Sequence, residues 1–322
     1  MNIVILDGYA ANPGDNPWES IERLGDVTVY DRTMDHHFFE RAAEADVIIT
    51  NKVLLTEQRL DKLNKLKCIC VLATGVNNVD IEAAGARGIV VCNVPAYSTA
   101  SVAQYTFALL LELCHRVGHH DTQVRAGRWT AGPDFCFWDS PQVELDGKTF
   151  GIVGFGQIGS RVGAIAHAMG MNMIATTRTS KPAPGHEPFA WASLEEVFAR
   201  SEVVSLHCQL TEDNAGFVNA RLLGMMKPTA FLINTSRGAI MNEKDLAAAL
   251  NEGRLAGAAL DVVAAEPIRA DNPLLKARNC IITPHIAWAA LEARQRLIQI
   301  TAQNVSSFIA GNPVNAVNMP KR

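Results

Sequence analysis

A glycine-rich turn near the middle of the chain constrains its fold more than any other feature. Gly154, Gly156 and Gly159 are spaced as G-x-G-x-x-G, directly after an apolar run at 149–153 and at the start of a helical pattern at 158–169. In such a strand-turn-helix unit, the first glycine permits the tight turn, the second lets the backbone approach a pyrophosphate, and the third lets the helix pack close to the strand. The helix N-terminus then offers unpaired N–H groups to phosphate oxygens. The context therefore predicts a dinucleotide-binding domain.

Short apolar segments alternate with helical segments on both sides of this turn. Before it, we expect strands at 3–6, 27–30, 47–50, 69–73 and 90–93, with helices at 56–63 and 81–87. From the turn region onward, we expect strands at 149–153, 173–176, 203–207, 230–234, 257–262 and 280–283, with helices at 158–169, 193–200, 220–226 and 243–252. This alternation predicts an α/β protein with two doubly wound parallel-sheet, Rossmann-like domains.

The domain boundaries follow from three segments that do not fit the alternation. An apolar helix at 98–117 and an aromatic-rich loop at 126–142 separate the two sets of strands, and a last helix at 291–310 has no strand of its own in the second domain. A helix that is apolar on all sides lies between layers or at a subunit interface, and a long ordered loop suggests function or a partner. We expect a first domain of 1–98 plus 290–322, completed by the last helix, and a dinucleotide-binding domain of 99–289.

Composition places the protein among ordinary globular enzymes. Of the 322 residues, 48% are hydrophobic and 19% are charged, and the net charge of -4 favours neither nucleic acid nor an anionic membrane. The seven cysteines are scattered without a C-x-x-C pair, so we expect reduced, buried thiols rather than disulfides or a metal site. The N-terminal residues are typical of a strand rather than a signal peptide, and no apolar run is long enough to cross a bilayer. We expect a cytoplasmic enzyme.

The segment after the second strand of the dinucleotide domain bears on the choice of coenzyme. An NAD enzyme usually has an acidic residue there, which binds the ribose hydroxyls. This chain instead has Thr177, Arg178, Thr179 and Ser180, followed by Lys181. A guanidinium with neighbouring hydroxyls suits a 2′-phosphate, which predicts the use of NADP. The alternative is that Arg178 stacks on the adenine or is solvated and that NAD is used.

Three polar side chains follow strands of the second domain. Arg237, Glu266 and His285 stand after the strands at 230–234, 257–262 and 280–283, and the carboxyl ends of parallel strands border the ligand crevice. Histidine exchanges a proton near neutral pH, a carboxylate orients it, and arginine binds a substrate carboxylate and polarises a carbonyl. The trio suits hydride transfer at the 2-position of a small hydroxy or keto acid, with His285 as acid/base, Glu266 as its partner and Arg237 as substrate binder.

With these motifs in this order, the sequence resembles the D-isomer-specific 2-hydroxyacid dehydrogenases over essentially the whole chain. The stretches that carry the resemblance are 147–159, 232–238, 259–267 and 283–288. The resemblance implies that Arg237, Glu266 and His285 are catalytic. It further implies that Asp261 lies near the nicotinamide amide. Further cofactor contacts are expected from Gln157, Ile158, Thr177, Cys208, Thr235 and Ser236. The resemblance implies two domains with a cleft between them, the first substrate-binding and flavodoxin-like, and a homodimer formed through 99–145.

Within the family, the chain is most similar to the glycerate dehydrogenase (hydroxypyruvate reductase) branch, through the stretches 72–80, 135–139 and 285–288. This similarity implies that Thr74, Gly75 and Val76 bind the substrate together with Arg237 and His285, the backbone N–H groups of a glycine loop holding the carboxylate. Trp288 and Trp138 would shape a small pocket or serve as interface packing. The chain departs from the family at Thr177, which replaces the usual acid, and at Gln209, which replaces the usual proline.

Two rival functions stay open at the level of sequence. The first is another reaction of the same family, on glyoxylate, phosphoglycerate-type or bulkier 2-keto acids, or on formate. The second is a dinucleotide-sensing co-regulator that keeps the fold and the trio without significant turnover. Turnover of hydroxypyruvate separates the second from the enzyme.

Overall fold

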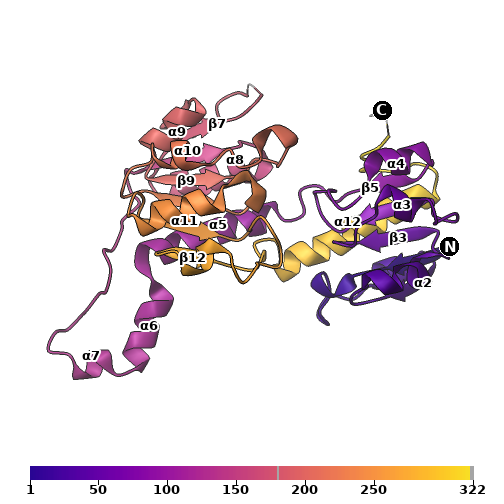
Figure 1. Cartoon of the computed structure of the whole chain (residues 1–322), viewed down its shortest axis with the longest axis horizontal. Helices are drawn as coiled ribbons and strands as arrows, with labels where there is room; N and C mark the ends of the chain where they lie inside the picture. The colour runs from indigo at the N-terminus through magenta and orange to yellow at the C-terminus, as the bar shows by residue number, and fades with distance from the viewer. Residues whose placement is uncertain (180, 320–322) are drawn as a thin grey trace. The chain divides into compact units, whose positions relative to one another are not determined.

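The computed structural model describes residues 1–179 and 181–319, which divide into two compact units. Unit 1 comprises Met1–Ser98 and the chain from Trp288 onward, and unit 2 comprises Thr99–Ala287. Each unit contains one parallel sheet with helices, coloured indigo to purple and yellow in unit 1 and purple to orange in unit 2 (Figure 1). Ser180, one of the hydroxyl residues expected beside Arg178, lies outside the described residues.

The sheet of unit 1 has the strand order β2-β1-β3-β4-β5, and every pairing is parallel. Its strands are β1 (Asn2–Ile5), β2 (Asp26–Val29), β3 (Val47–Thr50), β4 (Cys68–Val71) and β5 (Val90–Cys92). Its helices are α1 (Glu19–Glu22), α2 (Phe38–Ala42), α3 (Glu57–Leu60), α4 (Ile81–Ala86) and α12 (Leu291–Ile309). Successive residues of a strand face opposite sides of a sheet, so each side of unit 1 carries its own core.

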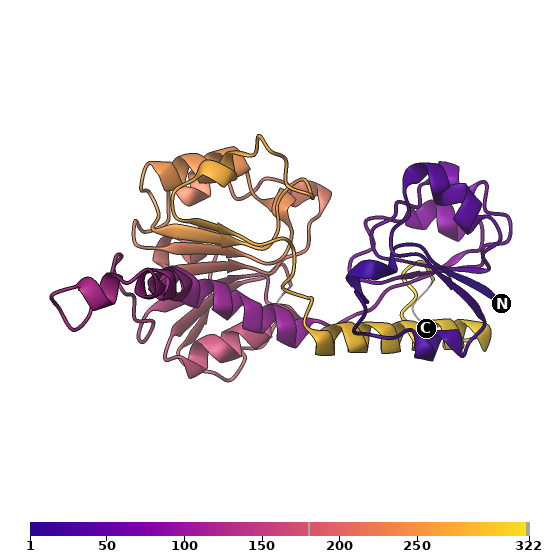
Figure 2. The same ribbon diagram turned by 90° about the horizontal axis from the view of Figure 1, so that it is seen from below.

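The last helix, α12, covers one of those two sides (Figure 2). Leu297, Ile298 and Val305 of α12 pack in one buried cluster with Ile3 and Ile49 of the sheet. On the other side, Val4 and Ile48 pack against residues of α2, α3 and α4. The expectation that the last helix returns to complete the first part of the chain is therefore confirmed.

Unit 2 has a larger sheet with the order β12-β11-β10-β9-β6-β7-β8, again parallel throughout. Its strands are β6 (Thr149–Val153), β7 (Asn172–Thr176), β8 (Phe189–Trp191), β9 (Val203–Leu206), β10 (Phe231–Asn234), β11 (Gly257–Leu260) and β12 (Cys280–Ile282). Its helices are α5 (Thr99–His115), α6 (Val117–Arg125), α7 (Arg128–Ala131), α8 (Gln157–Ala168), α9 (Leu194–Arg200), α10 (Ala220–Leu223) and α11 (Glu243–Asn251).

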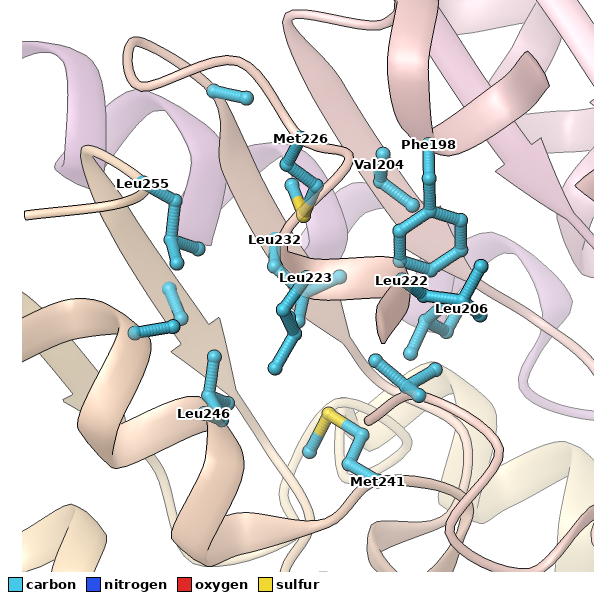
Figure 3. Packing of buried hydrophobic residues seen from close by; sticks show 14 of the residues in the cluster. Phe198, Val204, Leu206, Leu222, Leu223, Met226, Leu232, Met241, Leu246 and Leu255 are labelled. Carbon is cyan, nitrogen blue, oxygen red and sulfur yellow. The ribbon is translucent and has the colours of Figure 1, made fainter. Parts of the chain in front are cut away.

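Both sides of this second sheet are covered. On one side, side chains of α9, α10 and α11, such as Phe198, Leu223 and Leu246, pack on Val204 and Leu232 (Figure 3). On the other side, α5 and α8 lie together on the sheet, with Phe107 stacked on Phe150 at 5.7 Å between ring centroids. The two sheets with helices on both faces confirm the predicted α/β, doubly wound fold class.

The segment between the two sets of strands differs from the expectation. One helix was expected at 98–117 and a loop at 126–142, but α5 ends at His115, Arg116 adopts a left-handed conformation with φ 47°, and α6 and α7 follow. Figure 1 shows α6 and α7 standing away from the rest of unit 2. The short strand β8 was also missed. Among the described residues, no helix is long and apolar enough to cross a membrane.

Candidate active site

The glycine turn joins β6 to α8, and each of its three glycines has a different environment. Gly154 has φ +94°, and a Cβ at this position would lie 2.7 Å from the backbone of Cys208. A Cβ at Gly159 would lie 2.2 Å from the carbonyl oxygen of Gly154. Gly156, at the N-terminus of α8, has nothing within 4 Å of its Cβ position. The turn therefore presents open backbone next to a helix N-terminus, an arrangement that fits a pyrophosphate.

A hollow lies beyond the end of β7, next in the sheet to the glycine turn. It has a volume of about 250 Å³ and is lined by Thr176, Thr177, Thr179, Lys181, Trp191 and Ala192. Lys181 Nζ donates a hydrogen bond of 2.7 Å to the carbonyl oxygen of Phe155, in the middle of the glycine motif. Burial raises the pKa of the Cys208 thiol, and a backbone hydrogen bond and the positive charge of Arg178 oppose this in part. The sequence analysis had identified Arg178 but not the anchored position of Lys181.

Arg237, Glu266 and His285 follow three strands that are neighbours in the sheet, β10, β11 and β12. All three strands run parallel to β6, so these side chains stand at the same end of the sheet as the glycine turn. The carboxyl ends of parallel strands are where ligands bind in open α/β sheets.

His285 and Glu266 form a hydrogen-bonded pair. The distance between His285 Nδ1 and Glu266 Oε2 is 2.7 Å, and their side chains are 26% and 34% exposed. Glu266 Oε1 also accepts a bond of 3.3 Å from the backbone N–H of Val263, which holds the carboxylate against its own loop. His285 has φ +56°, a left-handed conformation that is uncommon outside glycine and often marks functional sites. A carboxylate on Nδ1 orients the ring and leaves Nε2 available for proton transfer.

Asp261 fixes the loop that carries His285. It is 1% exposed, and its Oδ1 accepts hydrogen bonds from Thr283 Oγ1 (2.7 Å) and the N–H of Ile286 (2.9 Å). Its Oδ2 accepts from the N–H of Ala287 (2.8 Å). Burial raises the pKa of the Asp261 carboxyl, and these three bonds lower it in part. The residues on both sides of His285 are thus tied to one buried carboxylate, a role that the sequence analysis missed.

The loop of Arg237 is held by Asn234 and by a close backbone approach. The buried Asn234 accepts from the N–H and Oγ of Ser236 and donates from Nδ2 to the carbonyl oxygen of Arg237. A Cβ at Gly238 would lie 1.9 Å from the carbonyl carbon of Val263, so the loops after β10 and β11 touch there. Thr235 Oγ1 lies 3.2 Å from Thr106 Oγ1 of α5. This packing places Arg237 beside the loop that leads to Glu266.

The remaining predicted substrate residues belong to unit 1. Thr74 Oγ1 donates to the carbonyl oxygen of Val94, and Gly75 and Val76 follow in the loop after β4. Trp288 packs edge-on against Tyr97, with 6.3 Å between ring centroids. Thr74, Gly75, Val76 and Trp288 stay predictions for substrate binding.

Residues 107–287 match the model of the NAD-binding domain of D-isomer specific 2-hydroxyacid dehydrogenases. The chain belongs to this family. This D-2-hydroxyacid dehydrogenase is 47% identical over 321 residues to hydroxypyruvate reductase of Blautia hydrogenotrophica, covering 99% of this chain and 100% of that one. It is 38% identical to glycerate dehydrogenase of Methylorubrum extorquens, over 86% of this chain and 87% of that one.

The fold comparison agrees with the family. D-lactate dehydrogenase from Aquifex aeolicus, solved with NAD and lactic acid, superimposes with a TM-score of 0.86 at 27% identity, over 100% of both chains. This D-2-hydroxyacid dehydrogenase is therefore an oxidoreductase that acts on 2-hydroxy acids with a nicotinamide dinucleotide.

Proposed function

We propose that this enzyme reduces hydroxypyruvate to D-glycerate. The observation that carries the proposal is the 2.7 Å pair of His285 and Glu266 at the same sheet end as the glycine turn. The choice of acid is supported by the hydroxypyruvate reductase of Blautia hydrogenotrophica, which is similar over its whole length. Glyoxylate is the second candidate, because the relatives include a glyoxylate reductase of Aeropyrum pernix that is 37% identical over 93% of this chain.

The three catalytic side chains take distinct roles in this proposal. His285 donates a proton from Nε2 to the oxygen of the 2-keto group, since Nδ1 is engaged by Glu266. Glu266 holds the ring orientation and stabilises the imidazolium before transfer. Arg237 binds the substrate carboxylate or keto oxygen and stabilises the charge that develops there.

The glycine turn holds the dinucleotide in this proposal. The N–H groups of Gly156, Gln157 and Ile158, at the start of α8, bind the pyrophosphate. When bound there, the reduced dinucleotide supplies the hydride. Thr235, Ser236, Cys208 and Asp261 complete the cofactor site, and Thr74, Gly75, Val76 and Trp288 bind the substrate from the loops of unit 1.

We further propose that NADPH is accepted. The hollow beyond β7 is lined by threonine hydroxyl groups and Lys181, and no carboxylate is among its lining residues. Arg178 lies in the sequence between two of the lining residues, Thr177 and Thr179. Arg178→Ala is expected to raise the KM for NADPH about 10-fold or more through the lost charge-assisted bonds, with little change for NADH. Arg200→Ala, at the exposed end of α9, is the matched control. A KM for NADH far below that for NADPH in the unmodified enzyme contradicts the idea.

The function is tested by following the absorbance of NADH and of NADPH with hydroxypyruvate, glyoxylate, pyruvate and a bulky 2-keto acid. We expect the highest kcat/KM with hydroxypyruvate and a loss of about 10²–10⁴-fold in His285→Ala. His36→Ala, an exposed histidine of unit 1, is the control and should keep full activity. Binding of the dinucleotide without turnover of any acid would favour the co-regulator instead.

The arm formed by α6, α7 and residues 132–142 supports a homodimer, which we include in the proposal. Trp129, Phe135 and Trp138 on this arm are 51%, 89% and 63% exposed, and exposed large apolar side chains grouped on one segment are typical of a protein–protein interface. Light scattering should give twice the chain mass, and the double change Phe135→Ser with Trp138→Ser should give the monomer mass. A monomer in the unmodified protein contradicts this.

The seven unpaired cysteines agree with a reducing compartment, so we place the enzyme in the cytoplasm.

A further inference from the structure

Three buried cysteines of unit 1 lie together in the sheet. Cys68 and Cys70 are on β4, where residues two apart face the same side of the sheet. Cys92 is on the neighbouring strand β5 and is the register partner of Cys70. All three have no solvent exposure and lie in the cluster beneath α12. The sequence analysis treated the cysteines as scattered, because this grouping depends on the pairing of β4 with β5.

The sulfur atoms have the spacing of a three-coordinate metal site. Cys68 Sγ and Cys70 Sγ are 3.9 Å apart, and the Sγ atoms of all three cysteines lie within 4.8 Å of one another. An ion that binds three sulfurs in a plane, with bonds of about 2.3 Å, holds them about 4.0 Å apart. Small side-chain rotations are therefore enough to bring the three sulfurs onto one ion.

The surroundings select the kind of ion. Apolar residues such as Ile49, Leu72 and Leu297 belong to the same cluster as the three cysteines. Among the described residues, no carboxylate or imidazole joins the three sulfurs in their group of closely spaced metal-ligating atoms. Hard cations that need oxygen ligands are excluded by such a site, and thiolates select soft ions. The group offers three sulfur ligands, one fewer than the four of a structural zinc site, so Cu(I) fits it better than Zn²⁺.

We propose that Cys68, Cys70 and Cys92 form a three-sulfur site for a soft monovalent cation, Cu(I). Binding forms metal–sulfur bonds and releases the protons of the thiols that become thiolates to solvent, with no change in oxidation state. The ion crosslinks β4 and β5 beneath α12, so it acts on stability rather than on catalysis.

The three thiols share hydrogen bonds with one another. Those from Cys68 and Cys70 lower the pKa of the Cys92 thiol, and those with Cys68 and Cys92, together with burial, raise the pKa of the Cys70 thiol. Since the ligand must be a thiolate, binding weakens as pH falls. At Cys114 and Cys280, burial is the main cause and raises the pKa of the thiols to about 11 and about 12.

The position of Cys92 provides a route for the ion. It lies on the edge strand β5, whose outer side is covered by the segment after α12. Cys92 forms an isolated antiparallel bridge with Ala316, the N–H of Asn93 donates to the carbonyl oxygen of Asn315, and that of Val317 donates to Val91. Terminal segments are among the first parts of a fold to open, and release of this one would uncover the edge next to the site.

The test is an anaerobic titration of the full chain with Cu(I), in competition with a coloured Cu(I) chelator. We expect one ion per chain, an ultraviolet sulfur-to-copper band, and a higher Tm on loading. Cys70→Ala and Cys92→Ala should weaken binding about 100-fold or more. Cys114→Ala, which removes a buried cysteine of unit 2, is the matched control and should bind as the unmodified protein does.

Several results overturn the proposal. Binding no tighter than in Cys70→Ala, or equal loss in Cys114→Ala, shows that the trio is not the site. If both variants of the trio fail to fold by circular dichroism, X-ray absorption of the loaded, unmodified protein decides. Three sulfur neighbours at about 2.3 Å support the site, and oxygen or nitrogen neighbours, or two sulfurs, contradict it.

Discussion

The buried carboxylate of Asp261 offers the sharpest test of how the site is held together. Asp261→Asn keeps the shape of the side chain but replaces one acceptor oxygen with an NH₂ group. In the better of its two orientations, the amide oxygen still accepts from Thr283 and the N–H of Ile286, and the NH₂ faces the N–H of Ala287. In the other orientation, the NH₂ faces two donors.

The size of the effect follows from these contacts. One charge-assisted hydrogen bond, about 1.5–3 kcal/mol, is lost, and the N–H of Ala287 is left unsatisfied at a cost of about 1–3 kcal/mol. Ala287 is 3% exposed, so water does not replace the bond. Removing a carboxylate whose pKa is raised by burial offsets part of this loss. We expect a net loss of about 2–4 kcal/mol in the free energy of unfolding of unit 2.

Denaturant unfolding and steady-state kinetics with hydroxypyruvate measure the two consequences. The variant should also lose about 10-fold or more in kcat/KM, because the residues on both sides of His285 are no longer fixed. Thr283→Val is the graded control, since it removes one charge-assisted bond, worth about 1.5–3 kcal/mol, and leaves the N–H of Ala287 paired. If Asp261→Asn unfolds within about 0.5 kcal/mol of the unmodified enzyme and keeps its kcat, the tethering argument is wrong.

Two further outcomes follow from the structure. Gly238→Ala should abolish most turnover while unit 2 stays folded. The new Cβ would lie 1.9 Å from the carbonyl carbon of Val263, so it must separate the loop of Arg237 from the loop of Glu266. Normal kcat/KM in this variant would show that the loops tolerate separation. Burial lowers the pKa of His207 to about 3 from 6.5, so its neutral form stabilises the fold above pH 6.5 and that contribution is lost as pH falls towards 3. The free energy of unfolding, measured in urea from pH 8 to 4, should fall by at most about 1.4 kcal/mol per pH unit below pH 6.5 because of this group. His207→Gln should show a smaller fall with pH, and an equal fall in both proteins would refute the assignment.

Most strands and the glycine turn were predictable because they depend on local pattern. Continuous apolar runs mark strands such as β3 and β6. Gly154 is required by a contact with the segment after the next strand of the sheet and Gly159 by a contact within the turn itself, whereas Gly156 leaves open backbone. The positions of Arg237, Glu266 and His285 after three strands also followed from sequence, because parallel strands bring their carboxyl ends to one edge.

What was missed depends on tertiary contacts. No proline or glycine marks the end of α5 at His115 in the sequence. The helix ends because Arg116 adopts a left-handed conformation, and the Arg116 guanidinium donates a hydrogen bond of 2.6 Å to Oδ1 of Asn279, which is far away in the sequence. The strand β8 is short, and its Phe189 and Trp191 pack around Phe155. The tethering by Asp261 was hidden because a carboxylate at a strand end has the same sequence pattern whether it binds a ligand or a backbone loop.

The return of α12 to unit 1 has a consequence for how the protein is made. Arg294 of α12 pairs with Asp15 and reaches the carbonyl oxygen of Ala11, and Asn318 bonds to the backbone of Ile89 and Val91. During synthesis, residues 99–287 leave the ribosome as an uninterrupted stretch and can fold as soon as they emerge. The first part of the chain, although made earlier, has one side of its sheet only partly covered, by residues such as Trp18 and Ile21, until α12 is released. Nascent chains arrested before α12 should therefore show a protease-resistant second unit and a first unit that is cut, the reverse of the order in which they are translated.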